Sequence, residues 1–129
     1  MARLLVVDDD ANIRFLLQEE LTLAGYSVQS AADGPAGLEA AELDPPDLVI
    51  LDIKMPGMGG LEVLRRLKQT RPNLPVLLFT AFGDFKDEAR ALGADGYLVK
   101  SFDLAALADS VRKTLAEASR RLTSPPRSA

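Results

Sequence analysis

Short apolar runs in this 129-residue chain end in residues that can bind a metal ion or a phosphate group. These residues are Asp8, Asp9 and Asp10 after the first run, and then, after later runs, Asp52, Thr80 and Lys100. Each also has an ordinary structural use, since an aspartate before a helix often caps it, a strand-end threonine bonds a turn and a lysine stays solvated. Their common position at the ends of apolar runs indicates one shared site.

The carboxylates of Asp8, Asp9 and Asp52 would raise one another's pKa at close range unless a cation neutralises them. Hard oxygen ligands suit Mg²⁺, which proteins bind through one or two carboxylates together with a phosphate. Lys100 supplies a positive charge and Thr80 a hydroxyl donor, the groups needed opposite a metal to hold phosphoryl oxygens. The residues therefore predict Mg²⁺ as cofactor and a phosphoryl group as ligand.

Because the chain contains no cysteine and no histidine, the available covalent route at such a site is a carboxylate nucleophile. The lack of both also excludes disulfide frameworks, structural zinc and Ser-His or Cys-His catalytic pairs. Asp52 is the candidate, and its attack on phosphorus would form an aspartyl phosphate. Neither glycine-rich phosphate loop motif is present, so nucleotide binding is unsupported and the phosphoryl group must come from elsewhere.

The overall charge is −4, from 15 lysines and arginines against 19 aspartates and glutamates. This balance argues against nucleic acid as a direct partner. The chain shows no signal-peptide pattern and no apolar stretch of membrane-spanning length. We therefore expect a cytoplasmic protein with no membrane attachment.

Apolar runs alternate with segments of helical periodicity, which predicts an α/β fold. Strands are expected at Leu4–Val7, around Val28, and at Leu48–Leu51, Val76–Phe79 and Tyr97–Val99; helices are expected on an apolar face of Ile13, Leu16, Leu17 and Leu21, and at Gly34–Leu43, Gly60–Thr70, Phe85–Leu92 and Leu104–Arg121. Three runs are continuously apolar, which is typical of parallel strands covered on both faces. Right-handed crossovers then give a doubly wound five-stranded parallel sheet, (βα)5, with its ligand site at the carboxyl ends of the strands.

The length fits one domain, residues 1–121, followed by a disordered tail or linker stub at residues 122–129. Four segments resemble the receiver domain of two-component response regulators, over about residues 3 to 118. They are Val6–Asp10, Asp47–Gly60 (DLVILDIKMPGMGG), Thr80-Ala81 and Tyr97–Lys100. The resemblance implies a CheY-like sheet with strand order 2-1-3-4-5.

The resemblance also assigns roles to residues of the expected site. It implies Mg²⁺ held by Asp8, Asp9, Asp52 and the backbone carbonyl of Lys54. Asp52 would accept phosphate from a histidine kinase or phosphotransfer protein, and Thr80 and Lys100 would contact the phosphoryl group.

In the family the threonine is coupled to an aromatic residue on the fifth strand, which switches a protein-binding face. Tyr97 is the matching aromatic, and its alternative interpretation is a half-buried tyrosine with its hydroxyl in water. Lys54 and Phe82 occupy positions that in the family tune hydrolysis of the acyl phosphate. Both are bulky, so we expect a long-lived phosphoryl group; the alternative is a solvated lysine and a partly packed phenylalanine.

The sequence departs from the family pattern after Lys100, where Ser101 replaces the usual proline that follows a cis bond. A cis bond before another residue is costly, so either local contacts offset that cost or the bond is trans and Lys100 sits differently. We expect a looser loop around Ser101 and weaker activation than in the family.

The predicted function is a phosphoacceptor domain that is not a metabolic enzyme, although it catalyses its own phosphorylation and dephosphorylation. It would serve as a single-domain regulator or relay intermediate. The alternatives are an excised receiver of a larger regulator, a phosphorylation-independent binding module, and an aspartate-nucleophile phosphatase of the haloacid-dehalogenase type. For that phosphatase, Lys54 stands where a carboxylic acid is required.

Two partner surfaces are expected. In the family that the chain resembles, exposed positions of the first helix recognise the upstream kinase or phosphotransfer protein, which implies such a role for Arg14, Gln18 and Leu21. An unknown downstream protein would dock near Tyr97, where Phe82, Phe85 and Phe102 are candidate exposed aromatics. The alternative for each of these three residues is packing in the core.

Overall fold

The computed structural model describes residues 1–101 and 103–123, and in these residues strands and helices alternate along the chain. The elements are β1 (Arg3–Val7), α1 (Ala11–Leu23), β2 (Ser27–Ala31), α2 (Gly34–Leu43), β3 (Leu48–Leu51), α3 (Gly60–Thr70), β4 (Val76–Thr80), α4 (Lys86–Ala91), β5 (Gly96–Val99) and α5 (Leu104–Thr123). The strands form one sheet in the order β2-β1-β3-β4-β5, and all neighbouring pairs are parallel. The predicted doubly wound sheet and its strand order are confirmed.

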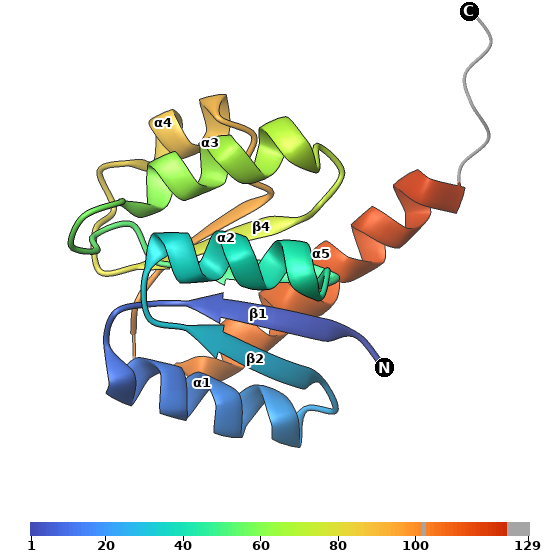
Figure 1. The fold of residues 1–129 in the computed structure, drawn as a ribbon. Coiled ribbons are helices and arrows are strands. Elements are labelled where there is room, and N and C mark those ends of the chain that lie inside the picture. Colours follow the sequence, from blue (N-terminus) through green and yellow to red (C-terminus); the bar gives the residue numbers. More distant parts are fainter. Residues whose placement is uncertain (102, 124–129) are drawn as a thin grey trace, which may run out of the picture.

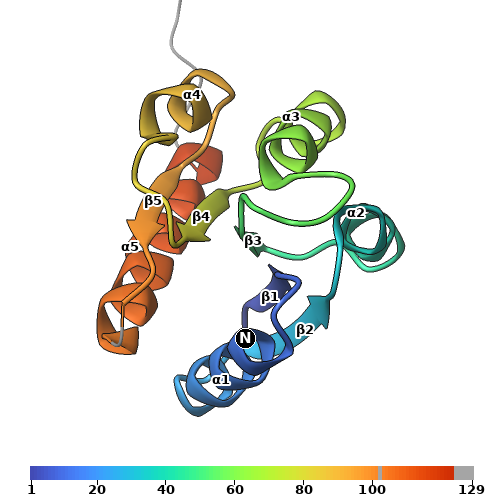
Figure 2. The ribbon, with the colours of Figure 1, turned by 90° about the vertical axis from the view of Figure 1, so that its left-hand side faces the viewer.

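Helices cover both faces of this sheet (Figure 1). Side chains alternate between the two faces along a strand, so Leu4 and Val6 of β1 pack with α1 and α5, whereas Leu5 and Val7 pack with α2 and α3. In Figure 2, α1 and α5 accordingly lie on one side of the sheet and α2 and α3 on the other. The continuously apolar strands β1, β3 and β4 are buried on both faces, as their sequences predict.

The strand register brings the carboxyl ends of the central strands level with one another. Val7 pairs with Leu51, and Leu51 pairs with Leu78. The loops that follow β1 and β3 therefore leave the sheet side by side, which places Asp8 next to Asp52. Thr80 pairs with Val99 and so lies beside the end of β5, next to Lys100.

The structure corrects part of the predicted apolar face of α1. Leu17 and Leu21 are buried, but Leu16 is 48% exposed. Consecutive helical residues point about 100° apart, so a helix that turns Leu17 fully into the core leaves Leu16 at the rim.

Some predicted boundaries also shift. The fourth helix is shorter than predicted, since α4 begins after Phe85 and ends before Leu92. The second strand runs over Ser27–Ala31, an edge strand whose half-exposed residues give only a weak apolar signal. Helix α5 continues through Thr123, past the predicted boundary at residue 121, while the rest of the predicted tail and the candidate aromatic Phe102 lie outside the described residues. Among the described helices, none combines the length and the apolar character needed to cross a membrane.

Candidate functional site

The three aspartates after β1 have different surroundings. The Asp10 carboxylate caps α1, because its Oδ1 accepts from the backbone N–H groups of Asn12 at 2.9 Å and Ile13 at 3.4 Å. The Asp8 side chain is buried, and its Oδ1 accepts from the backbone N–H of Asp10 at 2.9 Å. Asp9 is exposed to solvent. Asp10 thus has the structural role of a helix cap, and Asp8 and Asp9 remain for the site.

The carboxylate oxygens of Asp8, Asp9 and Asp52 lie together, within 4.8 Å of one another. Asp8 and Asp52 are only 2% and 6% exposed, while Asp9 opens the cluster to solvent. Hard oxygen donors gathered from two loops, with one side open for water or a phosphate, fit Mg²⁺. The structure therefore brings together the three predicted metal-binding side chains.

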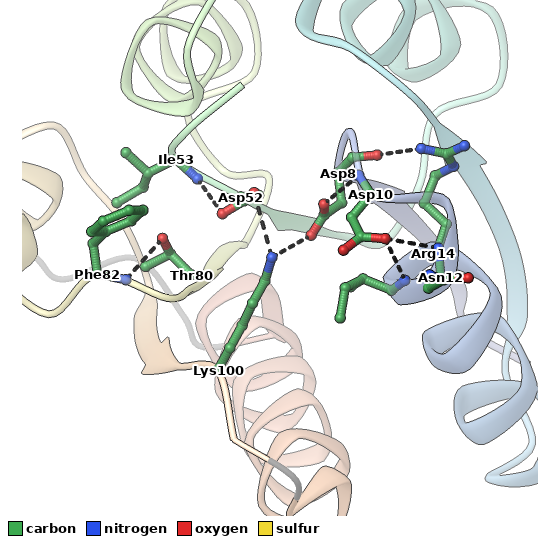
Figure 3. A network of polar contacts seen from close by, with 10 residues as sticks. Asp8, Asp10, Asn12, Arg14, Asp52, Ile53, Thr80, Phe82 and Lys100 are labelled. Carbon is green, nitrogen blue, oxygen red and sulfur yellow. Dashed lines mark hydrogen bonds and ion pairs between the residues drawn. The ribbon is translucent and has the colours of Figure 1, made fainter. Parts of the chain in front are cut away.

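The Lys100 ammonium lies between the two buried carboxylates (Figure 3). Its Nζ is 2.8 Å from Asp8 Oδ2 and 3.4 Å from Asp52 Oδ2. The described residues contain no cis peptide bond, so the bond from Lys100 to Ser101 is trans. Lys100 therefore reaches Asp8 and Asp52 although the bond that follows it is trans. The weaker activation expected from Ser101 stays a prediction.

Burial raises the pKa of the Asp52 carboxyl above its ordinary value, and the negative charge of Asp8 adds to the effect. Lys100 opposes both influences without cancelling them. For Lys100 itself, burial disfavours the ammonium, but hydrogen bonding and attraction to Asp8, helped by Asp52, raise its pKa. The site thus carries more negative charge than Lys100 neutralises, which a divalent cation would relieve.

Thr80 is fully buried at the end of β4, and its Oγ1 accepts from the backbone N–H of Phe82 at 3.3 Å (Figure 3). The carbonyl of the same Phe82 accepts a hydrogen bond from the Tyr97 hydroxyl. Burial, with the nearby charge of Asp84, raises the pKa of Tyr97. The Tyr97 hydroxyl therefore has a protein partner, and the Phe82 backbone connects it to Thr80.

Lys54, in the loop after β3, contacts two aromatic rings in the loop after β4. The Lys54 ammonium lies 5.6 Å from the centroid of the Phe82 ring and 4.7 Å from that of Phe85. The two rings pack edge to face with centroids 6.4 Å apart. The sequence singled out Lys54 and Phe82 separately, but not this cation–π contact, because nothing in their spacing shows that the loops after β3 and β4 approach each other.

The loop after β3 holds Asp52 through its backbone. The Asp52 N–H donates to the Val7 carbonyl at 3.0 Å, and its Oδ1 accepts from the Ile53 N–H at 2.9 Å. Gly60 then returns to this segment, donating its N–H to the Ile53 carbonyl at 2.8 Å. A Cβ at Gly60 would lie 1.9 Å from the Asp52 carbonyl oxygen, so only glycine fits there without a shift of the backbone.

The three residues of α1 predicted for partner recognition differ in their exposure to solvent. Gln18 is exposed on α1. Leu21 is fully buried, so its prediction as a recognition residue is wrong, because it lies on the core side of the helix. Arg14 is half-buried, and its guanidinium donates to the Asp8 carbonyl at 2.7 Å.

Beside Lys100 lies a groove of about 460 Å³ between α1 and the start of α5. Its walls are apolar and include Ile13, Leu16 and Leu104. Leu16, which is largely outside the core, therefore forms part of the wall of this groove.

Known proteins match this chain over most of its length. The family model of the response regulator receiver domain matches residues 4–112. Sporulation initiation phosphotransferase F of Bacillus subtilis is 41% identical over 88% of this chain and 93% of its own length. Response regulator MprA of Mycolicibacterium vanbaalenii is 44% identical over 88% of this chain, which spans only 50% of that longer protein.

Solved structures agree with these sequence relatives. Response regulator TrrA of Thermotoga maritima, solved in complex with Mg²⁺ and a beryllium fluoride, has a TM-score of 0.85 at 41% identity, covering 88% of this chain and 99% of that one. A receiver domain protein of Methanospirillum hungatei has a TM-score of 0.89 at 29% identity, and the match covers 94% of this chain and 98% of that one. Fold, motifs and relatives agree, and the chain belongs to the response regulator receiver domains of two-component signalling.

Proposed function

We propose that this receiver accepts a phosphoryl group on Asp52 from a histidine kinase or phosphotransfer protein and passes the signal on as a protein contact. The observation that carries the proposal is the position of the Asp52 carboxylate. It is nearly buried, 3.4 Å from the Lys100 ammonium, and grouped with the Asp8 and Asp9 carboxylates. A catalytic lysine and two further acids around one carboxylate suit phosphoryl transfer to that carboxylate.

The transfer forms one bond and breaks another. An Asp52 carboxylate oxygen attacks phosphorus as the bond from phosphorus to the donor, a histidine nitrogen or the oxygen of a small acyl phosphate, breaks. The donor leaves with that electron pair. Lys100 and the Thr80 hydroxyl would stabilise the phosphoryl oxygens.

The donor set around Asp52 supports Mg²⁺ as cofactor. Asp8, Asp9 and Asp52 would hold the ion, together with the Lys54 backbone carbonyl. When bound, Mg²⁺ neutralises charge on the transferring phosphoryl group. No metabolic substrate is turned over, and the chemistry serves the domain's own phosphorylation and dephosphorylation.

We propose that Thr80 and Tyr97 report the phosphorylated state. The two side chains bind the N–H and the carbonyl of the same residue, Phe82. If phosphorylation redirects the Thr80 hydroxyl toward a phosphoryl oxygen, the Phe82 backbone and the Tyr97 hydroxyl must adjust together. The surface around α4 and β5 would then change for a downstream protein.

The apolar groove beside Lys100 supports a relay role. The apolar groove between α1 and α5 lies beside Lys100, and the exposed Gln18 lies on the same helix α1. A helical phosphotransfer partner seated there would bring its phosphorylated histidine toward Asp52. The single-domain phosphotransferase relative, matched over 93% of its length, favours a relay intermediate.

Intact mass spectrometry with acetyl phosphate and Mg²⁺ tests the proposal. The wild-type chain should gain one phosphoryl group, and Asp52→Asn should gain none. Removing Mg²⁺ with a chelator should prevent the modification of the wild type. A phosphorylated Asp52→Asn chain, or steady hydrolysis of an unrelated phosphomonoester by the wild type, would contradict the proposal.

A further inference from the structure

Arg14 is joined to the acidic site from the side opposite Lys100. Its guanidinium Nη1 donates to the backbone carbonyl of Asp8 at 2.7 Å (Figure 3). Figure 3 shows the Asp8 carbonyl and the Asp8 carboxylate pointing in opposite directions, the first toward Arg14 and the second toward Lys100.

The location of Arg14 runs against the usual preference for charge along a helix. It stands near the N-terminal end of α1, where the aligned peptide dipoles favour negative rather than positive side chains. A cation here needs a compensating interaction, and the nearby one is the half-buried hydrogen bond to the Asp8 carbonyl. The hydrogen bond to Asp8 therefore offsets the unfavourable position of the Arg14 charge.

Asp8 is held at four atoms. Its N–H donates to the Ala31 carbonyl at 3.2 Å, and its carbonyl accepts from Arg14. One carboxylate oxygen accepts from the Asp10 N–H, and the other pairs with Lys100.

These contacts differ in what they require of the carboxylate. Lys100 pairs with a carboxylate oxygen of Asp8 that could also bind a metal ion, so Lys100 and the ion would compete for this oxygen. The Arg14 bond uses only the main chain and leaves both carboxylate oxygens unaffected. Of the two cationic contacts to Asp8, the one from Arg14 is thus compatible with an ion on the carboxylate.

We propose that Arg14 is a positioning residue that holds the main chain of Asp8 and thereby sets the affinity of the acidic cluster for Mg²⁺. This inference rests on the proposed function only in taking Asp8, Asp9 and Asp52 as the Mg²⁺ site. The partners of metal ligands commonly change metal affinity by about 10-fold to 100-fold when they are lost. Arg14 would act in this way through the backbone.

Charge alone makes the opposite prediction. A guanidinium near the cluster repels a second cation, so its removal should strengthen Mg²⁺ binding if electrostatics were its whole effect. Loss of a positioning bond should weaken binding instead. The sign of the change therefore separates the two roles.

Calorimetric titration of the full chain with Mg²⁺ measures this sign, without a phosphoryl donor. Arg14→Ala should bind Mg²⁺ about tenfold more weakly than wild type, and Arg14→Lys, which keeps the charge but not the planar fork, should recover part of the loss. Arg112→Ala is the matched control, because Arg112 is exposed on α5 and pairs with Asp109. Its affinity should equal that of wild type.

Thermal unfolding with a chelator shows whether each variant folds. If Arg14→Ala does not fold, Arg14→Lys decides: weaker binding at unchanged charge supports the proposal, and binding equal to wild type overturns it. Equal or tighter binding by a folded Arg14→Ala also overturns it while leaving the Mg²⁺ site intact. Absence of Mg²⁺ binding by wild type itself would overturn the proposed site, and the role of Arg14 with it.

Discussion

Asp52 carries its charge in a place that disfavours charge. The carboxylate is nearly buried and faces Asp8, and these two effects raise its pKa despite Lys100. An acid whose pKa is higher in the folded chain than in the unfolded chain destabilises the fold once the pH is high enough to ionise it. The proposed phosphoacceptor is thus ionised at a cost in stability.

Asp52→Asn should therefore raise the melting temperature at neutral pH when a chelator removes divalent cations. The gain should shrink as the pH falls through the raised pKa of Asp52, because the wild-type carboxyl then becomes neutral in the folded chain as well. Thermal unfolding across this pH range provides the measurement. A melting temperature for Asp52→Asn that is lower than wild type at neutral pH would show that the pair with Lys100 outweighs burial.

The Lys54 ammonium and the rings of Phe82 and Phe85 form one cluster in the loops that follow Asp52 and Thr80. Lys54→Ala and Phe82→Ala should each shorten the lifetime of the phosphorylated chain, because both open a path for water. A cation–π contact at an exposed site is worth about 0.5–1 kcal/mol, which corresponds to roughly a two- to fivefold change in rate. Loss of the phosphoryl group is followed by intact mass after removal of the donor.

Lys113→Ala and Phe15→Ala are suitable controls for that experiment, since both side chains are exposed. They should leave the decay rate unchanged. Rapid decay of the wild type that neither Lys54→Ala nor Phe82→Ala alters would refute the predicted long lifetime.

Individual site residues could be predicted where the sequence pattern fixed their position. Asp8, Asp52 and Lys100 directly follow parallel strands, Thr80 is the last residue of one, and parallel strands end at one edge of the sheet. The hydrogen bond from Arg14 to the Asp8 carbonyl and the Lys54 contact with Phe85 could not be predicted in the same way. They depend on helix rotation and on the approach of two loops, which spacing does not encode.

The connection from β3 to α3 begins with Asp52, the proposed acceptor, and Gly60 constrains the path of this connection. The Cβ of an alanine at this position would meet the Asp52 carbonyl oxygen at 1.9 Å. Gly60→Ala should therefore destabilise the fold by about 1–3 kcal/mol, as overpacking does, and slow phosphorylation of Asp52 because the backbone beside it must move. Denaturant unfolding and the mass assay measure the two effects.

Gly83→Ala is the control for Gly60→Ala. Its Cβ would meet a Val99 methyl group at 3.5 Å, an ordinary contact. It should unfold at a denaturant concentration close to that of wild type. Equal stability of Gly60→Ala and Gly83→Ala would show that the loop after Asp52 adjusts freely.

Among the elements, the buried central strands were the most predictable. Leu48–Leu51 is apolar at every position and is buried on both faces. The edge strand β2 and the short α4 were harder to delimit, because the exposed Ser27 and the partly exposed Phe85 lie at their ends. Burial of whole elements is thus encoded more strongly than their boundaries.

The molecule as a whole should be more stable with Mg²⁺ bound, because the cluster of Asp8, Asp9 and Asp52 exists only in the folded chain. Mass action predicts that the free energy of unfolding rises by about 2.7 kcal/mol when the Mg²⁺ concentration is 100-fold above the dissociation constant. Denaturant unfolding with and without Mg²⁺ measures it. Asp9→Asn, which alters the exposed member of this cluster, should lose most of the gain while keeping the stability of the metal-free chain.

The order of the strands shows what composition and periodicity leave open. The alternation of strand and helix predicts a parallel sheet, but many orders of five strands satisfy it. The order β2-β1-β3-β4-β5 came from the family resemblance of segments such as Asp47–Gly60. Physical patterning thus predicted the layers, and similarity to known proteins supplied the topology.

The claim that Asp52 is the phosphoacceptor is tested most directly by locating the modified atom. Borohydride reduces an acyl phosphate to an alcohol, so phosphorylated aspartate becomes homoserine. After treatment with acetyl phosphate and Mg²⁺, peptide mass spectrometry should find homoserine at position 52 and at no other aspartate. Homoserine at Asp8 or Asp9, or a phosphorylated chain that yields none, would contradict the account.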